Sequence, residues 1–116
     1  MGYLTTHVLD TALGRPAAGL EIRLYRVTSQ SRQKIVTMTT NEDGRTDSAI
    51  LPEGDFAQGT YELVFNAGAY LDRVGVPPED PRFLDEIPIR FGMSTDDHYH
   101  VPLLLSPFGY STYRGS

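Results

Sequence analysis

The chain has 116 residues, a length typical of one domain with a single core, and we expect residues 1–116 to form one domain. It carries 15 acidic and 10 basic side chains without a basic cluster, so nucleic acid and anionic membranes are not expected partners. Because there is no cysteine, disulfides, thiolate catalysis and thiolate metal sites are excluded. The N-terminus lacks the pattern of a signal peptide and no apolar run reaches about 18 residues, so we expect a cytoplasmic protein.

The first half of the chain predicts strands separated by turns. Apolar side chains alternate along residues 4–10 and again along residues 20–25, which predicts two half-buried strands. Gly14-Arg15-Pro16 predicts a turn between them. Residues 29–32 are polar and predict a loop, whereas the β-branched residues at 35–40 predict a third strand.

The second half continues in the same way. Asn41-Glu42-Asp43-Gly44 predicts a tight turn with Arg45 directly after it. Alternation returns at residues 61–65 and 87–91, and the one helix predicted is a short one at 69–74, bounded by Gly68 and by later prolines. Short strands, many turns and one helical segment predict an all-β sandwich of two sheets with seven to eight strands.

The last 19 residues, HYHVPLLLSPFGYSTYRGS, have the clearest pattern: an apolar strand, a Ser-Pro-Phe-Gly turn and a second strand that runs into Tyr-Arg-Gly-Ser. Alternation predicts a core face made of Tyr99, Val101, Leu103 and Leu105. The opposite face carries His98, His100, Pro102 and Leu104. That face is too apolar for ordinary exposure, which suggests a subunit interface. Pro102 also lacks the N–H that a central strand donates, a conflict that the pattern leaves open.

The three histidines are the first candidates for chemistry. By alternation His7, His98 and His100 all face outward from one sheet, and a neutral imidazole accepts a proton near neutral pH. Clustering beside an apolar face favours a functional role for His7 and His100, whereas His98, close to an acidic loop, is interpreted as a surface residue. A zinc site built from the three is a minor alternative, because no carboxylate stands ready to orient the rings.

Arg45 is the second kind of candidate. Its guanidinium fork fits a carbonyl, an enolate or a urate-like ring, although a solvated arginine after a turn is the simpler interpretation of the local sequence. The serines near the C-terminus lack a nucleophile elbow, and no glycine-rich phosphate loop is present.

Three segments carry a resemblance that covers essentially the whole chain. The opening LTTHVLDTALGRPAAGLEIRLYR, the middle TNEDGR and the closing YHVPLLLSPFGYSTYRGS resemble the transthyretin-related 5-hydroxyisourate hydrolases. The YRGS ending is the most specific element, because it separates the hydrolases from the transthyretin hormone carriers. The carriers also have other residue types where His7, Arg45 and His100 stand.

The resemblance implies a transthyretin-like sandwich assembled as a homotetramer, in which edge-to-edge dimers pack face to face and no metal or other cofactor is needed. It implies hydrolysis of 5-hydroxyisourate to 2-oxo-4-hydroxy-4-carboxy-5-ureidoimidazoline, in the degradation of urate toward allantoin, in the cytoplasm or, in a eukaryote, the peroxisome. The implied catalytic residues are His7, Arg45 and His100. The implied substrate-binding residues are Ser111, Tyr113, Arg114 and Ser116. Two alternatives are a non-enzymatic carrier of a small aromatic ligand and an immunoglobulin-like interaction module.

Overall fold

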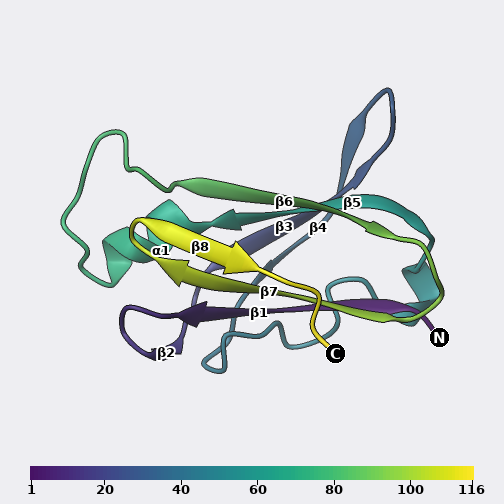
Figure 1. Cartoon of the computed structure of the whole chain (residues 1–116), viewed down its shortest axis with the longest axis horizontal. Coiled ribbons are helices and arrows are strands. Elements are labelled where there is room, and N and C mark those ends of the chain that lie inside the picture. The colour runs from purple at the N-terminus through teal and green to yellow at the C-terminus, as the bar shows by residue number, and fades with distance from the viewer.

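The computed structural model describes residues 1–116 and shows two four-stranded sheets packed as a sandwich, with one short helix at one end (Figure 1). The first sheet has the order β2-β1-β7-β8 and contains β1 (Tyr3–Asp10), β2 (Arg15–Pro16), β7 (His98–Ser106) and β8 (Gly109–Thr112). The second sheet has the order β4-β3-β5-β6 and contains β3 (Glu21–Val27), β4 (Arg32–Thr39), β5 (Gly59–Asn66) and β6 (Glu86–Met93). Helix α1 (Ala67–Arg73) and the 3₁₀ turn η1 (Glu53–Asp55) complete the elements. The predicted all-β sandwich is confirmed.

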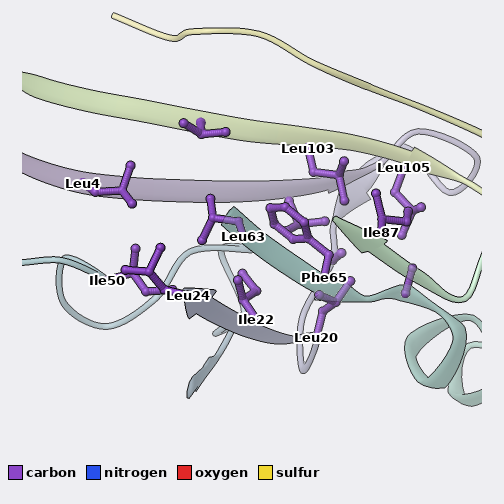
Figure 2. Close-up of a cluster of buried hydrophobic side chains, with 14 of the residues drawn as sticks. Leu4, Leu20, Ile22, Leu24, Ile50, Leu63, Phe65, Ile87, Leu103 and Leu105 are labelled. Carbon is purple, nitrogen blue, oxygen red and sulfur yellow. The ribbon is translucent and has the colours of Figure 1, made fainter. Parts of the chain in front are cut away.

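The core lies between the two sheets and is made by the strand faces that alternation predicted (Figure 2). β1 buries every second residue from Leu4 onward, and β7 buries Tyr99, Val101, Leu103 and Leu105. Twenty buried apolar residues form one continuous cluster. Since successive side chains of a strand point to opposite faces, this burial turns the residues between them, including the three histidines, out of the sandwich.

Two predicted loops are partly strand. Arg15–Pro16, expected in a turn, pairs with the end of β1 through Leu9 and Asp10. β4 begins at Arg32, earlier than predicted, because that side chain is held by distant partners. Its Nη1 lies 2.6 Å from Oε1 of Glu62, and its guanidinium lies 3.9 Å from the centre of the Tyr25 ring. These contacts join Arg32 to residues of other strands, so the local sequence pattern could not predict them.

Helix α1 begins at Ala67, two residues before the predicted start, and includes Gly68 instead of following it. The backbone N–H groups of both residues donate to the carbonyl oxygen of Asp85 at 3.0 Å, which satisfies two donors of the first turn. A Cβ at Gly68 would also collide with the Asp85 side chain. The glycine therefore permits close packing inside the first turn and does not mark the boundary before the helix.

The register resolves the conflict at Pro102. The carbonyl oxygen of Pro102 accepts a hydrogen bond from Thr112 Oγ1 at 2.7 Å, so its missing N–H would point to the same side, toward β8. However, the β7–β8 ladder ends at the pair Leu103–Thr112, and it resumes only where Gly115 N–H donates to the His100 carbonyl at 2.7 Å. Pro102 therefore lies in a local gap of the ladder, where no partner requires its N–H.

Two segments bring distant parts of the chain to the first sheet. β1 and β7 lie side by side and parallel, with Thr5 opposite His100 and His7 opposite Pro102. The long connection between β4 and β5 runs along the other edge of β1 and bridges it twice, at the pairs Leu4–Leu51 and His7–Arg45 (Figure 1). No helix has the length and apolar character needed to cross a membrane.

Candidate active site

Arg45 is positioned by the predicted turn. The Asn41 side chain accepts hydrogen bonds through Oδ1 from the N–H groups of Asp43, at 2.9 Å, and Arg45, at 3.2 Å. The Asn41 N–H donates to the carbonyl of Arg45 at 2.7 Å, which closes the turn. The carbonyl oxygen of Gly44, which has φ +74°, then accepts a hydrogen bond from the N–H of Val8 in β1 at 2.8 Å. The turn therefore docks Arg45 against β1 beside His7.

Replacing Gly44 with alanine is expected to lower the free energy of unfolding by about 2–5 kcal/mol. A Cβ there would need a left-handed backbone and would lie 2.4 Å from the Val8 carbonyl oxygen and 3.2 Å from the His7 ring. Gly14→Ala is the matched control, because Gly14 has φ +69° but open space around its Cβ position, so only about 1–2 kcal/mol is expected. Urea unfolding of both variants measures the difference, and equal losses would contradict the close approach at Gly44.

His7, His100 and Arg45, which are far apart in the sequence, meet on the outer face of the first sheet. The ring centres of His7 and His100 are 6.5 Å apart. His7 is bridged to Arg45 through the backbone, and the positive charge of Arg45 acts on both rings. The Arg45 guanidinium has no ion pair or hydrogen bond within the chain, so its fork stays available to a ligand.

The protonation of His7 follows from its partner. Its Nε2 lies 2.9 Å from the carbonyl oxygen of Asp43. A carbonyl oxygen only accepts hydrogen bonds, so Nε2 carries the proton and donates it. In the neutral ring Nδ1 is then the free acceptor.

His100 is held through its Nδ1, whereas His7 is held through its Nε2. Its Nδ1 lies 2.7 Å from the hydroxyl oxygen of Thr5 on the neighbouring strand, which leaves Nε2 as the ring nitrogen without a partner in the chain. On the edge of the ring, a Cβ at position 115 would lie 2.6 Å from His100 Cδ2, so the glycine of the YRGS ending permits the tail to lie against the imidazole.

Burial and charge favour the neutral form of both rings. Burial is the main cause that lowers the pKa of His7 below its ordinary value of 6.5, and the Arg45 charge lowers it further, against the opposing effect of Asp43. The pKa of His100 is also lowered, first by burial, then by Arg45 and by the two other histidines. Two imidazoles that remain neutral near pH 7 can accept protons there.

These lowered pKa values predict how stability depends on pH. Between the unfolded value of 6.5 and the lower folded values, the unfolded chain binds more protons, so the free energy of unfolding should fall as the pH decreases below about 6.5. Urea unfolding between pH 7.5 and 5.5 measures this slope. The double variant His7→Gln/His100→Gln should show a shallower slope, and identical slopes would refute the assignment.

The cleft beside these groups has a volume of about 540 Å³, within the range of small-molecule sites. It is lined mostly by polar residues, which come from β1, the segment after Gly44, the start of β7 and the C-terminal tail. The lining residues are Tyr3, Thr5, Thr6, Arg45, Thr46, Asp47, Ser48, Ala49, His98, His100, Tyr113, Gly115 and Ser116.

Of the residues predicted from sequence, the cleft includes Arg45, His100, Tyr113 and Ser116, whereas His7 does not line it and lies with its ring centre 6.5 Å from that of His100. Two others lie elsewhere in the single chain. Ser111 is exposed on β8 opposite Leu104, and Arg114 turns to the other face of the sheet, where its guanidinium lies 4.1 Å from the centre of the Tyr99 ring. Arg114 alternates with Tyr113 along an extended tail, which explains why the two side chains separate.

Sequence reasoning missed several cleft residues. His98, interpreted as a surface histidine, lines the cleft, as do Tyr3 and Thr5. A usable signal was present, because Tyr3, Thr5 and His7 share one face of the first strand by simple alternation. No three or more His, Asp or Glu side chains come together in an arrangement that holds a metal, so the geometry gives the zinc alternative no support.

Known proteins resemble this chain in sequence and in backbone structure. The profile of the HIUase/Transthyretin family matches residues 4–115. A protein of Rhizobium meliloti named 5-hydroxyisourate hydrolase 2 is 61% identical over 116 residues, covering 99% of this chain and 97% of its own length.

Two solved structures superpose on nearly the whole chain. Klebsiella pneumoniae 5-hydroxyisourate hydrolase has a TM-score of 0.83 at 34% identity and covers 100% of both chains. Sea bream transthyretin, solved in complex with thyroxine, has a TM-score of 0.86 at 28% identity and covers 97% of this chain and 93% of its own. The two TM-scores are similar, so the backbone alone does not distinguish between these two proteins, whereas the sequence identity is higher to the proteins named 5-hydroxyisourate hydrolase. With a profile match over nearly its full length and a relative above 60% identity, the chain belongs to the HIUase/transthyretin family.

Proposed function

We propose that this protein is an enzyme that hydrolyses 5-hydroxyisourate, without a metal or other cofactor, to 2-oxo-4-hydroxy-4-carboxy-5-ureidoimidazoline in urate degradation. The observation that carries the proposal is that the unpaired guanidinium of Arg45 and the imidazole of His100 line a cleft large enough for a purine-sized ring, with the imidazole of His7 beside them. The name of the 61% identical Rhizobium meliloti protein supports the same substrate.

The reaction opens a cyclic amide, and each group has a role that its geometry supports. Water adds to the carbonyl carbon while Nε2 of His100, the nitrogen without a partner, takes its proton. His7 orients the water through Nδ1, because its Nε2–H is already donated to Asp43. The guanidinium of Arg45 stabilises the oxyanion that forms on the carbonyl oxygen. The C–N bond then breaks, and the proton held by His100 passes to the leaving nitrogen.

The C-terminal tail supplies the substrate-binding residues of this proposal. Tyr113 and Ser116 line the cleft and would orient the ring. Ser111 and Arg114 do not reach it in the single chain, so in this proposal they contribute through the assembly, as part of a wall completed by a neighbouring protomer.

We place the protein in the cytoplasm as a homotetramer, a dimer of dimers. The edge strands β6 and β8 lie on the same side of the sandwich, which suits edge-to-edge pairing (Figure 1). The outer face of the first sheet mixes apolar and ionisable residues, among them Leu9, Leu104 and the histidines, which suits a second interface around a shared cleft. Light scattering after size exclusion tests the assembly, and a monomeric mass would overturn it.

The test of the function is to add freshly prepared 5-hydroxyisourate and follow its near-ultraviolet absorbance with and without protein. Substoichiometric protein should accelerate the decay through many turnovers. The alternative, a carrier of a small aromatic ligand, is favoured by the likeness to transthyretin and predicts stoichiometric binding with an unchanged decay rate.

A further inference from the structure

The hydroxyl group of Thr5 lies between two histidine rings. Its Oγ1 is 2.7 Å from Nε2 of His98 and 2.7 Å from Nδ1 of His100. A hydroxyl group has one proton, so it donates to one of these nitrogens and accepts from the other, which must then carry a proton. The tautomers of His98 and His100 are therefore coupled through Thr5.

The coupling is held by the pairing of β1 with β7. Thr5 lies opposite His100, and Tyr3 lies opposite His98 in the same parallel register. The rings of Tyr3 and His98 stack with their centres 4.1 Å apart and their planes within 4°. The branched side chain of Thr5 has few rotamers in a strand, so the three polar atoms keep their order.

We propose that Thr5 is a positioning residue and that His100, Thr5 and His98 form a proton relay along the wall of the catalytic cleft, an inference that rests on the proposed function. In the resting state the Thr5 hydroxyl donates to His98 Nε2 and accepts Nδ1–H of His100, so that His100 Nε2 is a base. When Nε2 takes a proton from water, Nδ1–H passes to Thr5 Oγ1 and the Thr5 proton passes to His98 Nε2. After these shifts His100 is neutral with its proton on Nε2, and His98 carries the positive charge. In the reverse shift, Nε2 of His100 gives its proton to the leaving nitrogen, Thr5 returns a proton to Nδ1 of His100, and His98 returns its extra proton to Thr5.

The position of Arg45 explains what the relay accomplishes. Arg45 is bridged to His7, and the β1–β7 register places His100 two residues and His98 four residues along from that bridge. At about 3.3 Å per strand residue, His98 lies roughly 7 Å farther along the strand from that bridge than His100 does. A positive charge formed on His100 would be repelled by the Arg45 guanidinium, and the relay transfers that charge to the more distant ring.

The coupling is measured directly by ¹⁵N chemical shifts of the imidazole nitrogens, which report the tautomer of each histidine. In the wild-type protein at pH 7.5, His100 should be protonated at Nδ1 and free at Nε2. Thr5→Val keeps the shape but removes the hydroxyl, so His100 should move toward the Nε2–H tautomer, and Thr5→Ser should restore the wild-type shifts. Thr11→Val is the matched control, because Thr11 Oγ1 bonds the Leu105 carbonyl at the far end of the same strand pair.

Kinetics test whether the relay serves the reaction. Thr5→Val should lower kcat by about 10- to 100-fold with little change in KM, Thr5→Ser should recover most of it, and Thr11→Val should be unaffected. His98→Phe preserves a ring against Tyr3 but ends the relay, so it should cost a similar factor. Because both changes break one relay, the double variant Thr5→Val/His98→Phe should be no slower than the worse single variant.

Unchanged His100 shifts in Thr5→Val would overturn the coupling, and multiplicative losses in the double variant would overturn the relay. The shift measurement needs no substrate. If the wild-type protein fails to accelerate the decay of 5-hydroxyisourate, the proposed function fails, while the tautomer of His100 still decides whether Thr5 positions it.

Discussion

Replacing His100 with glutamine is expected to lower kcat/KM for 5-hydroxyisourate by about 10²–10⁴-fold while the protein stays folded. The change removes the only ring nitrogen of His100 that faces no partner in the chain, and with it the base that takes the proton from water. Initial rates over a range of substrate concentrations measure the loss.

Circular dichroism and the urea midpoint at pH 7.5 are the controls for His100→Gln. The ring contributes to the site and lies outside the core cluster, so both should stay close to the wild-type values. A folded variant that keeps more than a tenth of the wild-type kcat/KM would remove His100 from the mechanism. His7 would then be the remaining candidate for the base.

Arg45→Met is expected to lower kcat by about 10²–10³-fold, the usual loss when one oxyanion donor is removed. Arg45→Lys should recover only part of this activity, because an ammonium group lacks the planar fork that holds two acceptors at once. Arg15→Met is the matched control, since Arg15 is an exposed arginine paired to the end of the same strand β1 and does not line the cleft. It removes the same charge and should leave turnover unchanged.

The Arg45→Met variant carries a second, independent readout. The Arg45 charge lowers the pKa of both His7 and His100, so its removal should raise both pKa values toward 6.5. A base with a higher pKa is protonated at higher pH, and the acid limb of the rate profile should therefore move to higher pH. Imidazole titration by NMR in wild-type and variant proteins measures the shift. An unchanged titration with a lowered rate would mean that Arg45 acts on the substrate alone.

The alternation of apolar residues was sufficient to predict which strand faces form the core. Leu4 and Val8 in β1 and Leu103 and Leu105 in β7 are fully buried, as their spacing predicted. The same alternation put His7 and His100 on the outer face of one sheet. What alternation did not contain was the order of the strands. Only the structure shows that β1 and β7 are parallel neighbours, which makes Thr5 the partner of both His98 and His100.

His98 shows why local interpretation failed at the cleft. Next to Asp96 and Asp97 it has the sequence context of a solvated residue, and its Tyr3 and Thr5 contacts come from a strand more than 90 residues away. Arg114 is the opposite case. It stands in the most specific segment of the resemblance, yet in the single chain it packs on Tyr99 and leaves the cleft to Tyr113 and Ser116.

By itself, the sequence determined the sandwich class, the buried strand faces, the turn before Arg45 and the set of residue types from which the site is made. These depend on interactions between residues close in the chain, namely alternation and turn conformation, which short-range patterns record. The tertiary structure alone decided that the turn docks on β1, that the tail rejoins β7 beyond Pro102, and that one threonine hydroxyl lies between two imidazoles. Those outcomes depend on strand register, which is set by the packing of the whole core, and a one-residue change in register would turn these groups to the opposite face.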